Sequence, residues 1–179
     1  MKWTKAIFFF FFACGILLAD QLLKVYVHYS IVPIHLSSSV YPFGGIGVLR
    51  EWHGIDFAIT HVINRGAAWG ILASFQDYLL YARILIIGGL LSYILFVTTS
   101  RLRKFCFVLI ATGAIGNVLD TFIYGHVIDM FYFILWGYSN AVFNLADAAI
   151  FCGVAVLLLE ALFKKISVKS VKKDARGSV

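Results

Sequence analysis

Four long apolar segments limit what this chain can fold into more than any other feature. They cover residues 6–27, 78–99, 105–124 and 142–163. A helix needs about 20 apolar residues to cross the roughly 30 Å hydrocarbon core of a bilayer, and each segment reaches that length. Only 13% of the 179 residues are charged, against about 25% in a typical soluble domain. The sequence therefore predicts an integral membrane protein with four transmembrane helices.

No boundary between folding units is visible. Pro33 and Pro42 both lie outside the apolar segments, and neither a repeat nor a low-complexity linker occurs. We expect one membrane domain over residues 1–179, with an outer segment at 28–77 and a basic tail at 164–179. Residues 55–63 are β-branched and partly alternate in polarity, which predicts a strand of a small sheet on the outer leaflet. A loop that merely seals the helix bundle is the alternative.

The distribution of basic residues predicts the orientation. Lysine and arginine gather before the first apolar segment, between the second and third, and after the fourth, whereas the loops 28–77 and 125–141 contain only Arg50 and Arg65. By the positive-inside rule both termini lie in the cytoplasm. The net charge of +6 does not indicate nucleic-acid binding, which needs basic side chains on an exposed surface with aromatic residues between them.

Cysteine and histidine do not form recognisable sites. Cys14, Cys106 and Cys152 all fall inside predicted spans, so no disulfide framework is expected. The run that ends at Cys14 imitates a cleavable lipoprotein signal, but apolar residues continue to Leu18 before Asp20, and we expect an uncleaved helix. The five histidines lack metal-ligand spacing. We expect neither a metal nor a cofactor.

Acids at membrane depth are the strongest indication of function. Asn117 and Asp120 form an Asn-x-x-Asp pair, Asn144 and Asp147 form a second, and Asp129 lies between them. A carboxylate in hydrocarbon costs several kcal/mol or more, so such acids usually face a polar cavity and belong to a functional site. Counted from the basic residue at each inner helix end, at about 1.5 Å per residue, three acids lie at nearly one depth. They are Asp20, Asp120 and Asp147, about 22, 24 and 25 Å from Lys5, Lys104 and Lys164.

Three alternative roles for the acids stay open. An Asn-x-x-Asp pair can simply join helices through hydrogen bonds worth about 0.6 to 2 kcal/mol. A proton- or ion-coupled transporter also needs membrane acids, but it places them near the midplane and often has repeated halves. A non-catalytic assembly subunit is a further alternative. The number of acids at one level near the outer boundary favours a functional site, and Asp129 in the short outer loop can reach it.

Five sequence blocks stand in order along the chain. They are Ala-Asp-Gln-Leu-Leu-Lys at 19–24, Asn-Arg-Gly-Ala-Ala-Trp-Gly at 64–70, Gly-Ala-Ile-Gly-Asn-Val-Leu-Asp at 113–120, Gly-His-Val-Ile-Asp at 125–129 and Phe-Asn-Leu-Ala-Asp at 143–147. With four spans, this order resembles the bacterial lipoprotein signal peptidases (signal peptidase II). The resemblance covers most of the chain.

The resemblance implies a fold, an activity and a set of site residues. The fold is an all-α membrane protein of four helices, with a small β-sheet (cradle) and a short outer helix in residues 28–77. The activity is that of an aspartic endopeptidase of the bacterial inner membrane, without metal or cofactor. It cuts prolipoproteins before the Cys that carries diacylglycerol. We expect a monomer, because four helices suffice to enclose such a site, and the depth of the acids places the site near the outer leaflet. The implied catalytic pair is Asp129 and Asp147, and the implied supporting residues are Asp20, Lys24, Asn64, Arg65, Gly66, Asn117, Asp120 and Asn144.

Two close carboxylates in a low-dielectric site cannot both ionise readily, so Asp129 and Asp147 are expected to share one proton. The ionised member then activates a water, and the protonated member polarises the scissile carbonyl.

The chain departs from the family pattern at three positions. Thr121 stands where an arginine is usual. Trp69 and Met130, the residue after Asp129, each stand where phenylalanine is more common. The missing arginine implies different contacts around Asp120. Arg65 and the Thr121 hydroxyl are the candidates to take its place.

Overall fold

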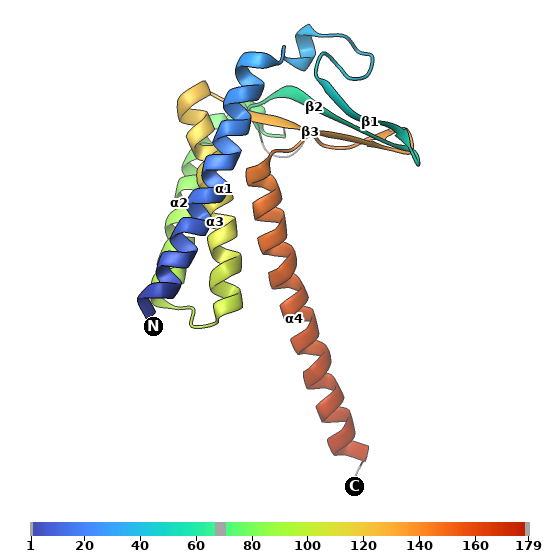
Figure 1. Ribbon diagram of the computed structural model, residues 1–179. Coiled ribbons are helices and arrows are strands. Elements are labelled where there is room, and N and C mark those ends of the chain that lie inside the picture. Colours follow the sequence, from blue (N-terminus) through green and yellow to red (C-terminus); the bar gives the residue numbers. More distant parts are fainter. Residues whose placement is uncertain (1, 67–70, 178–179) are drawn as a thin grey trace.

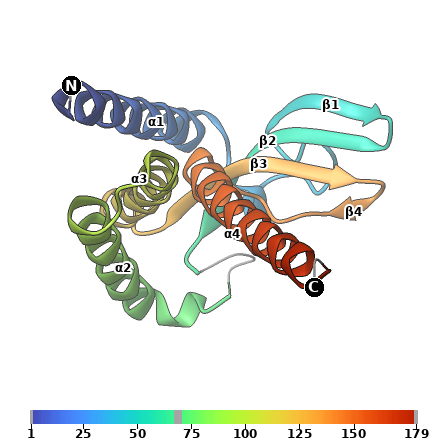
Figure 2. The ribbon, with the colours of Figure 1, turned by 90° about the horizontal axis from the view of Figure 1, so that it is seen from below.

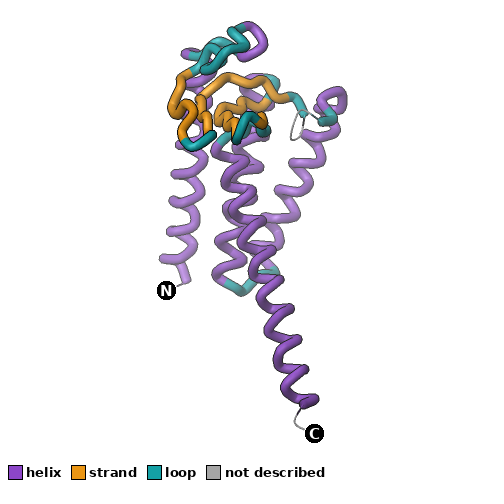
Figure 3. The backbone as a smooth tube through the Cα atoms, turned by 90° about the vertical axis from the view of Figure 1, so that its right-hand side faces the viewer, coloured by secondary structure: helices purple, strands orange, loops and turns teal. Residues whose placement is uncertain are grey.

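The computed structural model describes residues 2–66 and 71–177, and its long helices confirm the predicted spans. Among these residues the long helices are α1 (Lys2–Ser30), α2 (Gln76–Phe96), α3 (Arg101–Tyr124) and α4 (Leu145–Gly177). Each contains a stretch long and apolar enough to cross a membrane. Helix α1 runs without interruption through Cys14. Both termini lie at the end of the helices opposite the sheet (Figures 1 and 3).

Helix α3 is the centre of the bundle. It packs against α1, α2 and α4, and half of its most apolar window is buried, whereas α2 buries none of its residues. Figure 2 shows α3 surrounded by the other three helices. Its small residues permit this, because glycine and alanine let helix axes approach closely.

A four-stranded antiparallel sheet covers one end of the bundle, as Figure 3 shows. Its strands, in spatial order, are β1 (Ile46–Trp52), β2 (Ile55–Asn64), β3 (Val127–Leu135) and β4 (Tyr138–Ser139). Strand β2 confirms the strand expected at 55–63. Strand β3 lies in the segment that we expected to be a loop, and it pairs with β2 along most of its length. The four helices and this sheet agree with the expected fold.

The outer segment differs in detail from the expectation of a short helix. Its described helical turns are 3-10 turns at Ile34–Leu36 and Ala73–Phe75. Trp69 lies outside the described residues.

A bulge in β2 lies directly beside Asp129. Ile59 pairs with Phe131 and Val62 pairs with Asp129, so the two residues between them on β2 face the single residue Met130. Such a bulge bends the strand and re-aims its side chains. One bulged residue, His61, donates from Nδ1 to the carbonyl of Ile31 at 2.9 Å, because a carbonyl oxygen can only accept. The bulge thereby fastens the sheet to the end of α1.

Helices α3 and α4 meet through glycine. A β-carbon at Gly113 would collide with the backbone oxygen of Ala146, and one at Gly153 would lie 2.7 Å from the backbone oxygen of Cys106. A β-carbon at Gly116 would lie 3.2 Å from that of Ala146. Gly113 and Gly116 therefore serve the close packing of the two helices.

We expect Gly113→Ala to destabilise the protein, although alanine has the higher helix propensity. Forcing a methyl group into this contact costs about 1–3 kcal/mol. Gly88→Ala in α2 is the matched control, because nothing lies within 4 Å of the place that its β-carbon would take, and the same change there gains about 0.5–1 kcal/mol. Thermal unfolding in detergent compares the two. Equal melting temperatures for both variants would contradict the close α3–α4 contact.

Candidate active site

Lys24 is a buried cation held between two aspartates. Its Nζ lies 2.7 Å from Oδ2 of Asp20, one turn away on α1, and 2.7 Å from Oδ2 of Asp120 on α3. All three side chains are at most 1% exposed. Gln21 adds a hydrogen bond from Nε2 to Oδ1 of Asp120 at 2.9 Å. Buried charges are tolerated only when paired and hydrogen-bonded in this way.

The two aspartates also hold the backbone of two other elements. Oδ1 of Asp20 accepts a hydrogen bond from the backbone N–H of Ala146 at 2.9 Å, in the first turn of α4. Oδ2 of Asp120 accepts one from the backbone N–H of Ile128 at 3.3 Å, near the start of β3. The Lys24 cluster, formed by Asp20, Lys24 and Asp120, therefore positions the elements that carry Asp147 and Asp129.

Asn144 caps α4 rather than lying inside it. The helix begins at Leu145, whereas the predicted span began at 142. Oδ1 of Asn144 accepts from the backbone N–H of Asp147 at 2.8 Å, and Oδ2 of Asp147 accepts from the backbone N–H of Asn144 at 3.2 Å. This reciprocal capping box satisfies two N–H groups that a helix end leaves without partners. It also places the Asp147 carboxylate in the first turn, where the helix dipole favours negative charge.

Three asparagine amides surround the two remaining carboxylates. Asn144 donates to Oδ1 of Asp129 at 2.7 Å, and Asn64 donates to Oδ2 of the same residue at 2.8 Å. Asn117 donates to Oδ1 of Asp147 at 2.7 Å. Each carboxylate thus receives an N–H donor on both of its oxygens. Asn144 contacts both acids, one through its side chain and the other through its backbone.

Neighbouring groups determine which way each amide points. The oxygen of Asn64 accepts from the backbone N–H of Gly66 at 2.9 Å, and the oxygen of Asn117 accepts from Nζ of Lys24 at 3.1 Å. The oxygen of Asn144 accepts from a backbone N–H in the first turn of α4. An ammonium or backbone N–H can only donate, so every Nδ2 must face away from it, toward a carboxylate.

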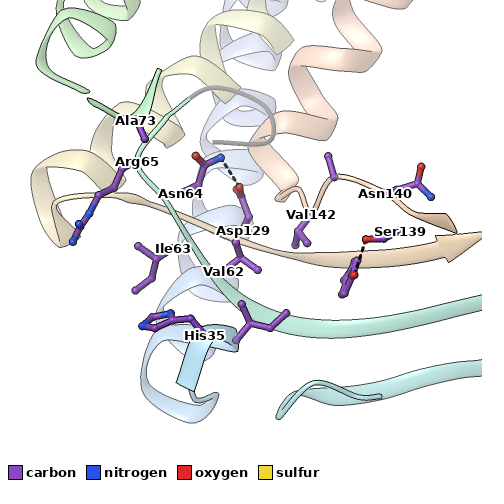
Figure 4. A pocket seen from close by; sticks show the side chains of 13 residues that line it. His35, Val62, Ile63, Asn64, Arg65, Ala73, Asp129, Ser139, Asn140 and Val142 are labelled. Carbon is purple, nitrogen blue, oxygen red and sulfur yellow. Dashed lines mark hydrogen bonds between the residues drawn. The ribbon is translucent and has the colours of Figure 1, made fainter. Parts of the chain in front are cut away.

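Asp129 and Asp147 line the same cavity. This cavity, of about 410 Å³, is also lined by Asn64, Asn117 and Arg83 and by apolar side chains of α4. A second cavity, of about 630 Å³, shares Asn64 and Asp129 with the first. Figure 4 shows that second cavity, with the Asn64 amide directed at Asp129. Asp129 therefore lines both cavities although it is only 2% exposed.

The surroundings of Asp129 favour its protonated form. Burial and, next, the negative charge of Asp147 raise the pKa of Asp129 to about 7, against the lowering effect of the hydrogen bonds from Asn64 and Asn144. Near neutral pH this carboxyl group can hold a proton.

Most residues expected at the site meet in one hydrogen-bonded network. The exception is Arg65, which is exposed and lines the larger cavity. The Thr121 hydroxyl donates to the carbonyl of Asn117 in its own helix at 3.2 Å. Met130 is fully buried in an apolar cluster with Val27 and Ile128, so it serves packing.

Sequence reasoning missed Arg83. Its half-buried side chain comes from α2 and lines the cavity that contains both aspartates. The available signal was a single arginine within an otherwise apolar helix.

We expect Lys24→Met to lower the free energy of unfolding by about 3–5 kcal/mol, because it leaves two buried carboxylates without their cation. Arg103→Met is the matched control. Arg103 pairs with Glu160 at 3.0 Å but is 38% exposed, so its loss is expected to cost far less than the loss of the buried Lys24. Unfolding in detergent, followed by circular dichroism, compares the variants. A Lys24→Met protein as stable as Arg103→Met would refute the structural role of the cluster.

Comparison with known proteins agrees with the resemblance in the sequence blocks. The family model described as signal peptidase (SPase) II matches residues 12–163. The lipoprotein signal peptidase of Chlamydia pneumoniae is 36% identical over 116 residues, which cover 64% of this chain and 69% of that protein. The lipoprotein signal peptidase of Campylobacter jejuni subsp. doylei is 33% identical over 127 residues, 70% of this chain and 78% of that one.

A solved structure shares the fold. A bacterial membrane enzyme determined by the in meso method at 2.3 Å resolution has a TM-score of 0.71 and 26% identity, with 90% of each chain covered. A second such enzyme, at 1.9 Å resolution, has a TM-score of 0.67 and 24% identity, covering 86% of this chain and 92% of its own, and shows the fold alone. With four helices of membrane-spanning length and a family model over most of its sequence, the chain belongs to the signal peptidase II family.

Proposed function

We propose that this chain is an aspartic endopeptidase that removes signal peptides from diacylglyceryl-modified prolipoproteins, with Asp129 and Asp147 as its catalytic pair. One observation carries the assignment of the pair: the two carboxylates line one cavity while Asn144 is hydrogen-bonded to both. Membership of the signal peptidase II family supports the substrate and the reaction. It gives no support to a transporter.

The two acids take different roles because their surroundings differ. Asp129 holds the shared proton, since burial and the charge of Asp147 raise its pKa to about 7. Asp147 is the ionised member, because it lies in the first turn of α4 and accepts hydrogen bonds from the Asn117 amide and the Asn144 backbone. Helix N-termini and N–H donors both stabilise a carboxylate.

The reaction then follows the general acid–base scheme. Asp147 takes a proton from a water molecule as the water oxygen attacks the scissile carbonyl carbon, and Asp129 donates its proton to the carbonyl oxygen. The tetrahedral intermediate collapses, the C–N bond breaks, and the proton now on Asp147 passes to the leaving amine. Asp129 recovers its proton from the intermediate's hydroxyl. The products are a signal peptide with a new carboxyl group and a lipoprotein with a new amino terminus on its lipidated Cys.

The site works without a metal in this proposal. Asparagine or backbone N–H groups face both oxygens of Asp129 and Asp147. These donors stabilise the carboxylate charge without a cation. The described residues also contain no group of three or more His, Cys, Asp or Glu side chains arranged to hold a metal ion.

The proposed location is the bacterial inner membrane, with both termini in the cytoplasm and the site near the outer leaflet. The concentration of basic residues at the termini and in the 101–104 connection supports this orientation. The apolar wall of the cavity, formed by Phe143, Ile150 and Phe151, continues onto the exposed surface of α4 and offers contacts for lipid chains. A monomer contains every residue of the proposed site.

We expect Asp129→Asn and Asp147→Asn each to abolish cleavage of a diacylglyceryl-modified precursor, since each removes one of the two proton-transferring groups. Loss of general acid–base catalysis typically costs 10²–10⁴-fold. Asp77→Asn, an exposed acid in the first turn of α2, is the matched control and should retain wild-type rates. The assay is run in detergent with and without a chelator. Cleavage retained in both site variants excludes this pair, and loss on chelation would indicate a metal enzyme.

We expect kcat/KM to fall as the pH rises above about 7. The pKa of Asp129 is raised to about 7, and the active form has Asp129 protonated, so activity is present below this value and is lost above it. Well above it, the rate should drop about tenfold per pH unit, and the apparent pKa belongs to the pair. The measurement is a pH–rate profile at low substrate concentration. A rate that stays constant to pH 9 would contradict the assignment of the proton.

A further inference from the structure

Arg83 is a charged side chain within the largely apolar helix α2. Beyond Asp77 in its first turn, α2 contains no other charged residue, and none of its residues is fully buried. An arginine at membrane depth is costly, so it almost always faces a cavity or a polar partner. Arg83 has both. It is half-buried, and it is the one cation among the described residues that line the cavity of Asp129 and Asp147.

A continuous series of hydrogen bonds leads from Arg83 to Asp129. Nη2 of Arg83 donates to the carbonyl of Gly66 at 2.9 Å. The backbone N–H of Gly66 donates to Oδ1 of Asn64 at 2.9 Å, and Nδ2 of Asn64 donates to Oδ2 of Asp129 at 2.8 Å. Gly66 is buried, and it is held from both of its backbone polar groups.

The orientation of Asn64 depends on this series. An amide rotated by half a turn would place its Nδ2 against the N–H of Gly66 and its oxygen toward Asp129, so neither of the present hydrogen bonds would remain. The N–H of Gly66 favours the present orientation as long as Gly66 stays in place. Gly66 lies just beyond the end of β2, outside the sheet ladder, so its position needs another contact. The guanidinium of Arg83 supplies one from a different helix.

We propose that Arg83 is a positioning residue of the peptidase: by holding Gly66, it keeps the Asn64 amide directed at Asp129. This inference rests on the proposed function of Asp129. From the sequence, Arg65 and the Thr121 hydroxyl are the candidates to replace the arginine that is usual at position 121. The Thr121 hydroxyl is instead bonded within its own helix, and Arg65 is exposed. The cation of the cavity comes from α2.

The test compares Arg83→Met and Arg83→Lys in full kinetic and pH profiles with a diacylglyceryl-modified precursor. We expect Arg83→Met to lower kcat about 10- to 100-fold, as misplacement of a reacting group does, with little change in KM. The decline of activity at high pH should move to higher pH, because the Asn64 hydrogen bond holds down the pKa of Asp129. Lysine can still donate to the Gly66 carbonyl, so Arg83→Lys should restore part of both properties.

A double-mutant cycle with Asn64→Ala separates positioning from general stability. If Arg83 acts through Asn64, the double variant should be no slower than Asn64→Ala alone, since groups in one hydrogen-bonded series are not additive. Arg103→Met is the control for loss of an arginine ion pair elsewhere, and its pH profile should match the wild type. If Arg83→Met does not accumulate, the same cycle is made with Arg83→Lys.

Two results would overturn the inference. One is a wild-type kcat and pH profile in the Arg83 variants, and the other is an effect that multiplies with that of Asn64→Ala. Asp129→Asn is assayed in parallel to keep the two proposals apart. If Asp129→Asn is inactive while the Arg83 variants behave as wild type, only the role of Arg83 is wrong. If Asp129→Asn still cleaves, the catalytic assignment itself fails.

Discussion

The buried ammonium of Lys24 is the contact on which the rest of the site depends. It joins α1 to α3 through Asp20 and Asp120, and each of these carboxylates uses its other hydrogen bonds to hold the backbone of α4 or β3. Two carboxylates this close would repel each other strongly without a cation, and a buried lysine without carboxylates would be an unpaired charge out of water. The cluster therefore holds α1, α3, α4 and β3 in fixed positions relative to one another. Its buried charges are stable only while they stay paired.

Three asparagines connect the Lys24 cluster to the two carboxylates of the proposed catalytic pair. Asn117 accepts from Lys24 and donates to Asp147, so the charge at the base of the network orients the amide that contacts a catalytic candidate. Asn144 does the same between Asp147 and Asp129. Amides suit this position because they link donor to acceptor without adding charge. The result is two acids in unlike surroundings, Asp129 buried and Asp147 partly buried in the first turn of α4, which is the usual condition for separate acid and base roles.

The sequence predicted those parts of the molecule that follow from hydropathy and depth. The four spans and the meeting of Asp20 with Asp120 at one level are of this kind, since helix rise alone relates residue number to depth. Strand β3 could not be recognised, because the residues of β2 that pair with it lie 63 to 80 positions away along the chain. The N-cap role of Asn144 and the hydrogen bond from Arg83 to the Gly66 carbonyl depend on where neighbouring elements begin and end. Local patterns do not contain that information.

Infrared spectroscopy of the carboxyl groups tests most directly whether Asp129 and Asp147 share a proton. Spectra of the wild type and of Asp129→Asn are recorded from acid to alkaline pH in protein labelled with 13C-aspartate. The account predicts a protonated carboxyl band at neutral pH that titrates near 7, as the raised pKa of Asp129 requires, and that is missing from the variant. Identical spectra for the two proteins at neutral pH, with no band lost on substitution, would contradict it.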